Sequence, residues 1–148
     1  MKPSLAIFLH SHGHDRVYQA ASLALAAASL GWSCHIFLFF QALATYVDGG
    51  WDAIAFEEKQ AETSGDDARS KDLARRLERG FENAALPSVY EMIERARREE
   101  GGVRIYACSA SVRLLELDPG AVRGKVDEIV GLPTMLRIAE SARFAWYI

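Results

Sequence analysis

Cysteine is scarce in this chain, which has only Cys34 and Cys108 among its 148 residues. The two are too far apart for a C-x-x-C motif, so this usual signal of a zinc site or a dithiol redox centre is absent. Two cysteines are also too few for a disulfide framework, and we expect a reducing, cytoplasmic setting. The first residues run directly into an apolar segment without a signal-peptide pattern, which supports that expectation.

The sequence also lacks the glycine-rich motifs that cradle phosphates, and it has no G-x-S-x-G nucleophile elbow. We therefore expect no nucleotide or other cofactor at the first strand–helix turn. The net charge is −3 and no basic stripe is interleaved with aromatics, which argues against nucleic acid as a partner. Residues 17–47 carry no charged side chain, but Gly31 divides them into an Ala/Leu-rich half and an aromatic half. This pattern favours a buried helix and a buried strand over a membrane span.

Apolar runs alternate with helix-prone segments along the chain. Strands are expected at 5–9, 34–40, 103–108, 126–130 and 144–148. Helices are expected at 16–30, 41–47, 69–80, 87–100, 112–117 and 133–141, with a polar loop at 61–68. The two charged helices, 69–80 and 87–100, have apolar stripes and should both cover the sheet. Together these elements predict one domain over residues 1–148: a flavodoxin-like, doubly wound α/β sheet of about five parallel strands.

Cys108 ends the third expected strand and precedes a short helix. Ligands of open α/β sheets bind at that edge, where the first helical turn favours a thiolate. Cys108 is therefore a candidate nucleophile or sulfur carrier, and the alternative is a small buried apolar residue. Ser109, Ser111 and Arg113 follow it and are candidates to hold an anion or supply charge.

The turn after the first strand is rich in histidine, with His10, His12 and His14 alternating. We expect no metal there, because Gly13 bends the segment; its free backbone N–H groups and Ser11 instead suit an anion. In a 2-1-3-4-5 strand order, His10 would lie at the strand end next to that of Cys108 and could relay its proton. Cys34 falls near the start of the second strand, at the opposite edge, and is interpreted as structural.

The chain resembles the DsrE/DsrF-like family of sulfur-relay proteins over nearly its whole length. The segments that carry the resemblance are 5–11, 15–20, 26–40, 105–111, 126–131 and the final helix and strand. The Ala-Cys-Ser-x-Ser segment, residues 107–111, is the most specific of them. The chain departs from similar proteins at the histidine-rich loop and in a long charged insertion, residues 48–100.

The resemblance implies a small domain that assembles into homotrimers or hexamers. It also implies that Cys108 carries sulfane sulfur as a persulfide and passes it between sulfurtransferases and acceptor proteins. His10 is the second candidate catalytic residue, because of its expected place at the neighbouring strand end. The chain would then be a sulfurtransferase or a sulfur-carrier subunit. The alternative is a non-catalytic α/β module that binds a small anion or a partner protein, with Cys108 structural. Accessibility of Cys108 distinguishes the two, because a carrier thiol must be reached by another protein's sulfur.

Overall fold

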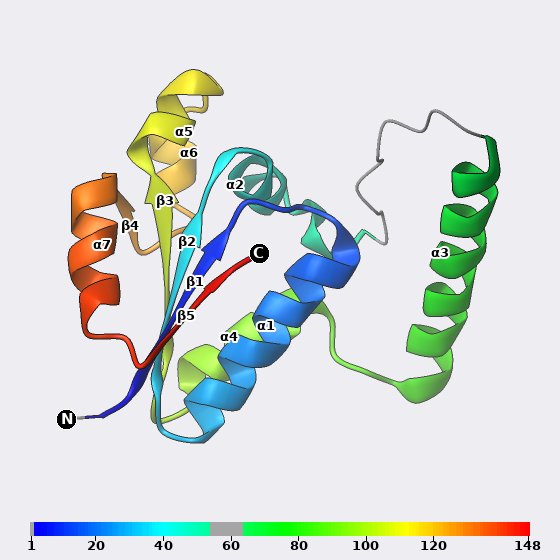
Figure 1. Cartoon of the computed structure of the whole chain (residues 1–148), viewed down its shortest axis with the longest axis horizontal. Helices are drawn as coiled ribbons and strands as arrows, with labels where there is room; N and C mark the ends of the chain where they lie inside the picture. The colour runs from blue at the N-terminus through cyan, green and yellow to red at the C-terminus, as the bar shows by residue number, and fades with distance from the viewer. Residues whose placement is uncertain (1, 54–63) are drawn as a thin grey trace.

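A single sheet of five parallel strands forms the centre of the molecule (Figure 1). The computed structural model describes residues 2–53 and 64–148, and only the backbone of residues 64–67. The strands are β1 (Ser4–Leu9), β2 (Ser33–Leu38), β3 (Val103–Cys108), β4 (Glu128–Val130) and β5 (Phe144–Tyr147). With helices on both faces of the sheet, this is the doubly wound α/β class expected from the sequence, and that prediction is confirmed.

The order of the strands in the sheet is β4-β3-β2-β1-β5. β2 therefore lies between β1 and β3, with Ile7 level with Ile36 and Ile36 level with Ile105. The expected 2-1-3-4-5 order, in which the first and third strands are neighbours, is wrong. Every buried parallel strand is a similar apolar run, so the sequence pattern finds the strands without ordering them.

Helices cover the two faces of the sheet unequally (Figure 1). The helices are α1 (His14–Ser29), α2 (Phe40–Val47), α3 (Ser64–Ala84), α4 (Val89–Arg98), α5 (Ser109–Leu114), α6 (Pro119–Arg123) and α7 (Leu132–Glu140), with a 3-10 turn η1 (Gly50–Asp52). Buried side chains of α1, α2, α4, α5 and α6 pack on one face in what we call the α1-side cluster. The α7-side cluster, on the other face, consists of Ala6, Phe8, Phe37, Phe39, Tyr106, Cys108, Val130 and Met135.

The alanine-rich helix α1 packs closely against its neighbours because its buried face is small. After the buried His14 in its first turn, that face consists of Val17, Ala20, Ala21, Ala24, Ala27 and Ala28. The amide of Gly101, just after α4, donates to Ala28 O at 3.3 Å. A Cβ on Gly101 would lie 2.0 Å from Trp32 O, so only glycine allows this approach of backbone to backbone.

The two charged helices differ from each other. α4 buries the stripe expected from the sequence, and Met92 and Ile93 lie in the α1-side cluster. α3 does not cover the sheet: it stands beside the body in Figure 1, and its Leu73 is 47% exposed. Its Phe81 contacts α1, with ring centroids 5.0 Å from Tyr18 and 5.2 Å from His14. The expectation that both helices cover the sheet is therefore wrong for α3.

Most expected elements are present with shifted ends. The expected loop at 61–68 is helical from Ser64 onward, and residues 61–63 lie outside the described part of the chain. The short helix after Cys108, whose core was expected at 112–117, begins at Ser109 directly after β3 and ends at Leu114. Among the described helices, none combines the length and the apolar character that crossing a membrane requires.

Candidate functional site

The carboxyl ends of the five strands meet at one edge of the sheet, where the chain enters its loops and helices. Backbone hydrogen bonds hold this edge together. The N–H groups of His10 and Ser11 donate to Ile148 O at 2.8 and 3.3 Å, and that of Phe39 donates to Leu9 O at 3.0 Å. The segments after β1, β2 and β5 are thus fixed to one another next to the end of β3 and Cys108.

Cys108 is the N-cap residue of α5 and the last residue of β3, with φ −69° and ψ 119°. Its side chain belongs to the α7-side cluster and is 4% exposed. Met135 of α7, which is fully buried, belongs to the same cluster. The expected position at the junction of a strand and a helix is confirmed, but the thiol is covered in this conformation.

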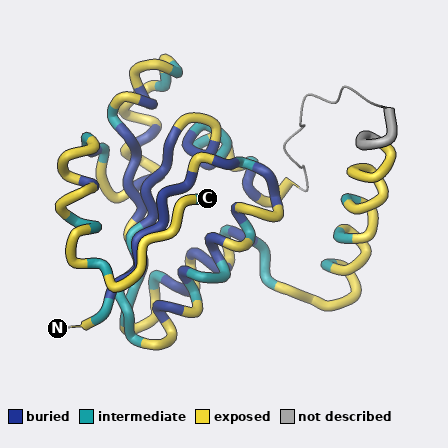
Figure 2. The backbone as a smooth tube through the Cα atoms, viewed as in Figure 1, coloured by how far each residue is buried: buried dark blue, intermediate teal, exposed yellow. Residues whose placement is uncertain are grey.

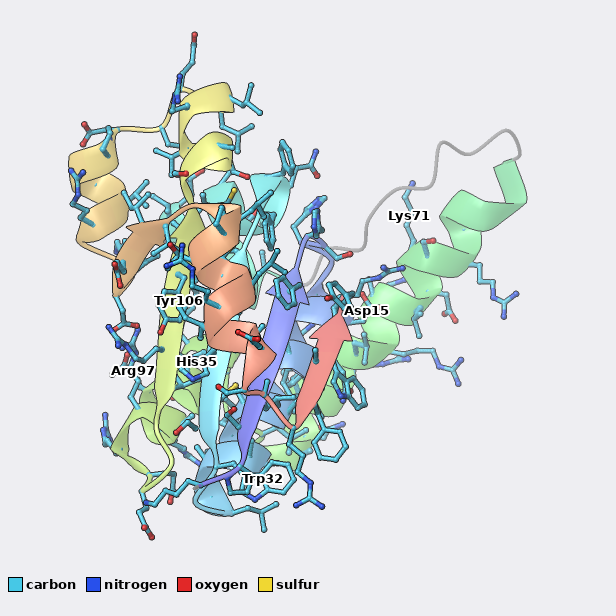
Figure 3. The ribbon with its side chains drawn as sticks, turned by 60° about the vertical axis from the view of Figure 1, so that its left-hand side comes forward. Asp15, Trp32, His35, Lys71, Arg97 and Tyr106 are labelled. Atoms are coloured by element: carbon cyan, nitrogen blue, oxygen red, sulfur yellow. The ribbon has the colours of Figure 1, made fainter. Side chains whose placement is uncertain are left out.

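An aromatic layer lies beneath Cys108 on the same face of the sheet. Tyr106 and Phe37 stack with ring centroids 5.1 Å apart, and Phe37 is 4.9 Å from Phe8. At the far end of the layer the Tyr106 hydroxyl is 3.2 Å from His35 Nδ1 (Figure 3). Burial, and then the charge of Arg104, lower the pKa of His35. The floor of the site is therefore apolar and closely packed.

His10 does not lie beside Cys108, so the expectation that the two residues occupy neighbouring strand ends is wrong. β2 separates their strands, and two strand spacings amount to about 10 Å. Phe39, which follows β2, occupies the position between them. Its ring stacks on the exposed His10 ring at 4.6 Å and 7°, and it shares the α7-side cluster with Cys108. A direct proton relay from Cys108 to His10 is thus absent from this geometry.

The two serines after Cys108 have different environments. Ser111 is fully buried, and its Oγ accepts a hydrogen bond from the Phe40 N–H at 3.0 Å. It fixes the turn between β2 and α2. Ser109 is half-buried and its hydroxyl has no hydrogen-bond partner among the described residues, while a Cβ on Gly131 would lie 3.8 Å from Ser109 Oγ. Of the two, only Ser109 is free to bind an anion next to Cys108.

Ser11 and Arg113 do not join this group. Ser11 is buried in the loop after β1, where its Oγ accepts from Arg16 Nη1 at 3.1 Å. Arg113 is exposed in the last turn of α5 and makes no ion pair with the described residues. The structure therefore leaves Ser109 as the candidate side chain that is available next to Cys108. Ser111 lies in the same first turn of α5, but its hydroxyl is engaged by the Phe40 N–H.

Phe40 is a feature of this edge that the sequence did not reveal. It has a positive φ of 42°, rare for a residue with a large side chain, and is 42% exposed. Such strain costs about 1–3 kcal/mol and persists where surrounding contacts enforce it. Here the hydrogen bond to Ser111 does so. In the sequence, Phe39 and Phe40 continue the apolar run of the second strand, so the pattern predicts a strand as far as Phe40 and no turn there.

The histidine-rich turn divides between two environments. His10 is exposed on Phe39, whereas His14 is buried against Tyr18 and Phe81, and burial lowers its pKa despite Asp52 and Asp15 nearby. Within residues 2–53 and 64–148, no three His, Cys, Asp or Glu side chains are grouped as a metal would require.

Cys34 lies on the opposite face of the sheet from Cys108. It is 1% exposed in the α1-side cluster and is level with Val103, at the starting edge of the strands. Burial raises the pKa of its thiol to about 12. Its expected place, away from the candidate site, is confirmed.

A second polar region lies on the α1 side, in a cleft of about 460 Å³ whose lining includes Tyr46, Tyr90, Arg97 and Asp127. The Arg97 guanidinium binds both Asp127 oxygens, at 3.1 and 3.2 Å (Arg97 is labelled in Figure 3). Asp127 Oδ2 also accepts the Ile105 N–H at 2.7 Å. The residues come from distant segments without a shared motif, so sequence reasoning missed them.

Comparison of the sequence with protein-family models and with curated proteins finds no match. The class of protein is thus defined by the fold and the site alone: a doubly wound α/β protein with a covered cysteine at the carboxyl edge of its sheet.

Proposed function

We propose that the protein is a sulfur carrier that holds sulfane sulfur as a persulfide on Cys108. The observation that carries the proposal is the place of this thiol, at the carboxyl end of β3 and directly before α5. The first amides of a helix favour negative charge, so this position suits both a thiolate and the terminal sulfur of a persulfide. Ser109 is the side chain available to donate a hydrogen bond to that sulfur.

The transfer is an exchange at sulfur. The Cys108 thiolate attacks the outer sulfur of a persulfide on a donor protein, forming a new S–S bond to Cys108. The donor's S–S bond breaks, and the donor cysteine leaves as a thiolate. In the second step an acceptor thiolate takes the sulfur in the same way. Each step conserves electrons and charge, and Cys34 takes no part because it is buried on the other face of the sheet.

The cover over Cys108 has to open for either step. Its 4% exposure does not admit another protein's sulfur, and Phe39 and Met135 belong to the same buried cluster as the thiol. Opening by movement of α7 is the simplest route, because α7 alone among the described helices contributes to the α7-side cluster. We propose that docking of the sulfur donor stabilises the open form.

The burial of Cys108 favours a second candidate, a non-catalytic module that binds a small anion or a partner protein. In that case Cys108 serves only as a packed residue. The exposed rings of His10 and Phe40 at the carboxyl edge would then provide contacts to the partner.

Persulfide loading separates the two candidates. Wild type, Cys108→Ser and Cys34→Ser are incubated with a persulfide-loaded sulfurtransferase, and the adduct expected for one sulfur atom, about +32 Da, is measured by mass spectrometry. The carrier proposal expects equal loading in wild type and Cys34→Ser and none in Cys108→Ser. Loading that persists in Cys108→Ser, or that fails in wild type with several donors, supports the module instead.

Further aspects of the proposal follow from the composition and the family resemblance. We propose a cytoplasmic protein that acts on sulfurtransferase and acceptor proteins, without nucleic acid or membrane as partner. We also propose that it is a homo-oligomer, a trimer or hexamer. The apolar C-terminal strand supports this, because its side chains are incompletely covered within one chain.

A further inference from the structure

The strand β5 is the last strand of the sheet, and among residues 2–53 and 64–148 none pairs with its outer side. All of its residues are exposed, and Figure 2 shows the strand in yellow along its length. Phe144 is 45%, Trp146 47% and Tyr147 73% exposed. The segment contains no charge, proline or glycine, which are the residues that protect the free edges of natural sheets from pairing.

The backbone of β5 has free hydrogen-bonding groups along this edge. Just after the strand, the N–H of Ile148 donates to Phe8 O and its carbonyl accepts from His10 N, both at 2.8 Å. Hydrogen-bonding direction alternates along a parallel strand, so residues 144 and 146 also face β1. The N–H and C=O groups of Ala145 and Tyr147 therefore point away from the sheet. Each of these four groups can therefore form a hydrogen bond with a further strand.

These outward groups are arranged symmetrically about Trp146. If a second β5 pairs antiparallel with the first, Ala145 lies opposite Tyr147 of the other copy, and each such pair exchanges two hydrogen bonds. All four outward groups of each strand are then satisfied. Trp146 faces its own copy across the two-fold axis, in a closely spaced pair that suits aromatic side chains. A strand of another protein would need to match this spacing, which a second copy does by identity.

The exposed aromatic area is large enough to contribute substantially to such an interface. At about 200 Å² for a whole aromatic side chain, the three exposed fractions amount to about 330 Å². A stable interface buries about 800 Å² on each partner, so the three rings can supply at most roughly two-fifths of it. The segment is uncharged, so the two copies do not repel each other at this edge.

We propose that two copies of this chain pair through β5, antiparallel and centred on Trp146, to form one continuous sheet across a molecular two-fold axis. Such an isologous contact occurs in dimers and in hexamers composed of two trimers, and not in a lone trimer. The interface lies at the edge of the sheet away from Cys108, which is on β3. It therefore stands or falls independently of the sulfur-carrier proposal.

Sedimentation velocity tests the interface with a matched pair of variants. Trp146→Lys introduces a charge at the two-fold axis, and Leu114→Lys introduces one at a residue on α5 that is 69% exposed. Wild type and Leu114→Lys should sediment as an even multiple of the 16.4 kDa chain at tens of micromolar, and Trp146→Lys should lose half of that mass. A monomeric wild type, a lone trimer, or an unchanged mass in Trp146→Lys would each overturn the proposal. If β5 instead binds a different protein, the purified wild type would be monomeric, which is the first of these outcomes.

Disulfide trapping tests the register and does not depend on the stability of Trp146→Lys. Trp146→Cys places two thiols opposite each other across the two-fold axis, where mild oxidation should link the chains. Phe144→Cys is the control on the same strand, because its partner position in this register is Ile148 of the other copy. Rapid crosslinking of Trp146→Cys alone supports the register. Equal crosslinking of both variants, or of neither, contradicts it.

Discussion

The stability of the protein in alkali should depend on Cys34, a thiol that lies outside the candidate site. Its pKa is raised from 9.0 to about 12 by burial, so the folded chain keeps the proton to a much higher pH than the unfolded chain does. The stability associated with this group is full below pH 9, where both states are protonated. It falls as the pH rises from about 9 to about 12, because only the unfolded state then loses the proton.

The size of the effect follows from the shift. Each pH unit well inside that window costs about 1.4 kcal/mol, and because the unfolded thiol is already half ionised at pH 9, wild type should lose about 2.3 kcal/mol between pH 9 and pH 11 through this one group. Cys34→Ala lacks the group and should not show this part of the loss. Urea unfolding of both proteins at pH 8, 9, 10 and 11 gives the two free energies of unfolding, and their difference cancels the contributions of all other groups.

The test is how the difference in unfolding free energy between wild type and Cys34→Ala changes with pH. A constant difference from pH 8 to pH 11 would refute the reasoning, because it would mean that Cys34 ionises equally easily in both states. Alkylation gives a second measurement. At pH 9 a thiol with pKa about 12 is roughly 0.1% ionised, against half for an ordinary one, so native Cys34 should react about 500 times more slowly than in urea.

Two further substitutions test other parts of the structure. Asp127→Ala removes the bidentate partner of Arg97 and the acceptor of the Ile105 N–H, and should cost about 2–4 kcal/mol of unfolding free energy. Asp118→Ala, which removes the N-cap of α6, should cost about 1 kcal/mol; equal losses in urea unfolding would contradict this. Met135→Ala loosens the α7-side cluster and should speed the reaction of Cys108 with a small disulfide reagent by at least about tenfold. Leu136→Ala, at a residue 60% exposed on the same helix, should leave the rate unchanged, and an equal rate in both variants would argue against opening through α7.

The sequence was sufficient for the fold class and for the position of Cys108, because both depend on local patterns. A strand buried on both faces is a continuous apolar run, and the run 103–108 followed by a helix locates the thiol at the carboxyl edge. The same patterns place Cys34 at the other edge, as the structure confirms. The ends of elements depend on contacts beyond the local pattern, and α5 ends at Leu114, before the expected end at Leu117.

The surroundings of Cys108 could not be predicted, because they depend on which strands are neighbours. The pairing of β2 with both β1 and β3 brings Phe39 between His10 and Cys108, and no local pattern specifies that pairing. The hydroxyl of Ser111 is likewise used by a turn that is remote in sequence, at Phe40. The apolar stripe of α3 resembles that of α4, yet Leu73 remains exposed. A stripe shows that a helix has an apolar face without showing what covers it.

The position of β5 next to β1 has a consequence for synthesis on the ribosome. β2, β3 and β4 each pair with the strand that precedes them in the chain, so most of the sheet can assemble in the order in which it is made. β5 instead pairs with β1, across almost the entire length of the chain. Until residues 144–147 emerge, the outer edge of β1 is the exposed one, with Ile7 and Phe8 in it. Until β5 pairs with β1, the outer edge of β1 is therefore open to misplaced strand pairing in the nascent chain.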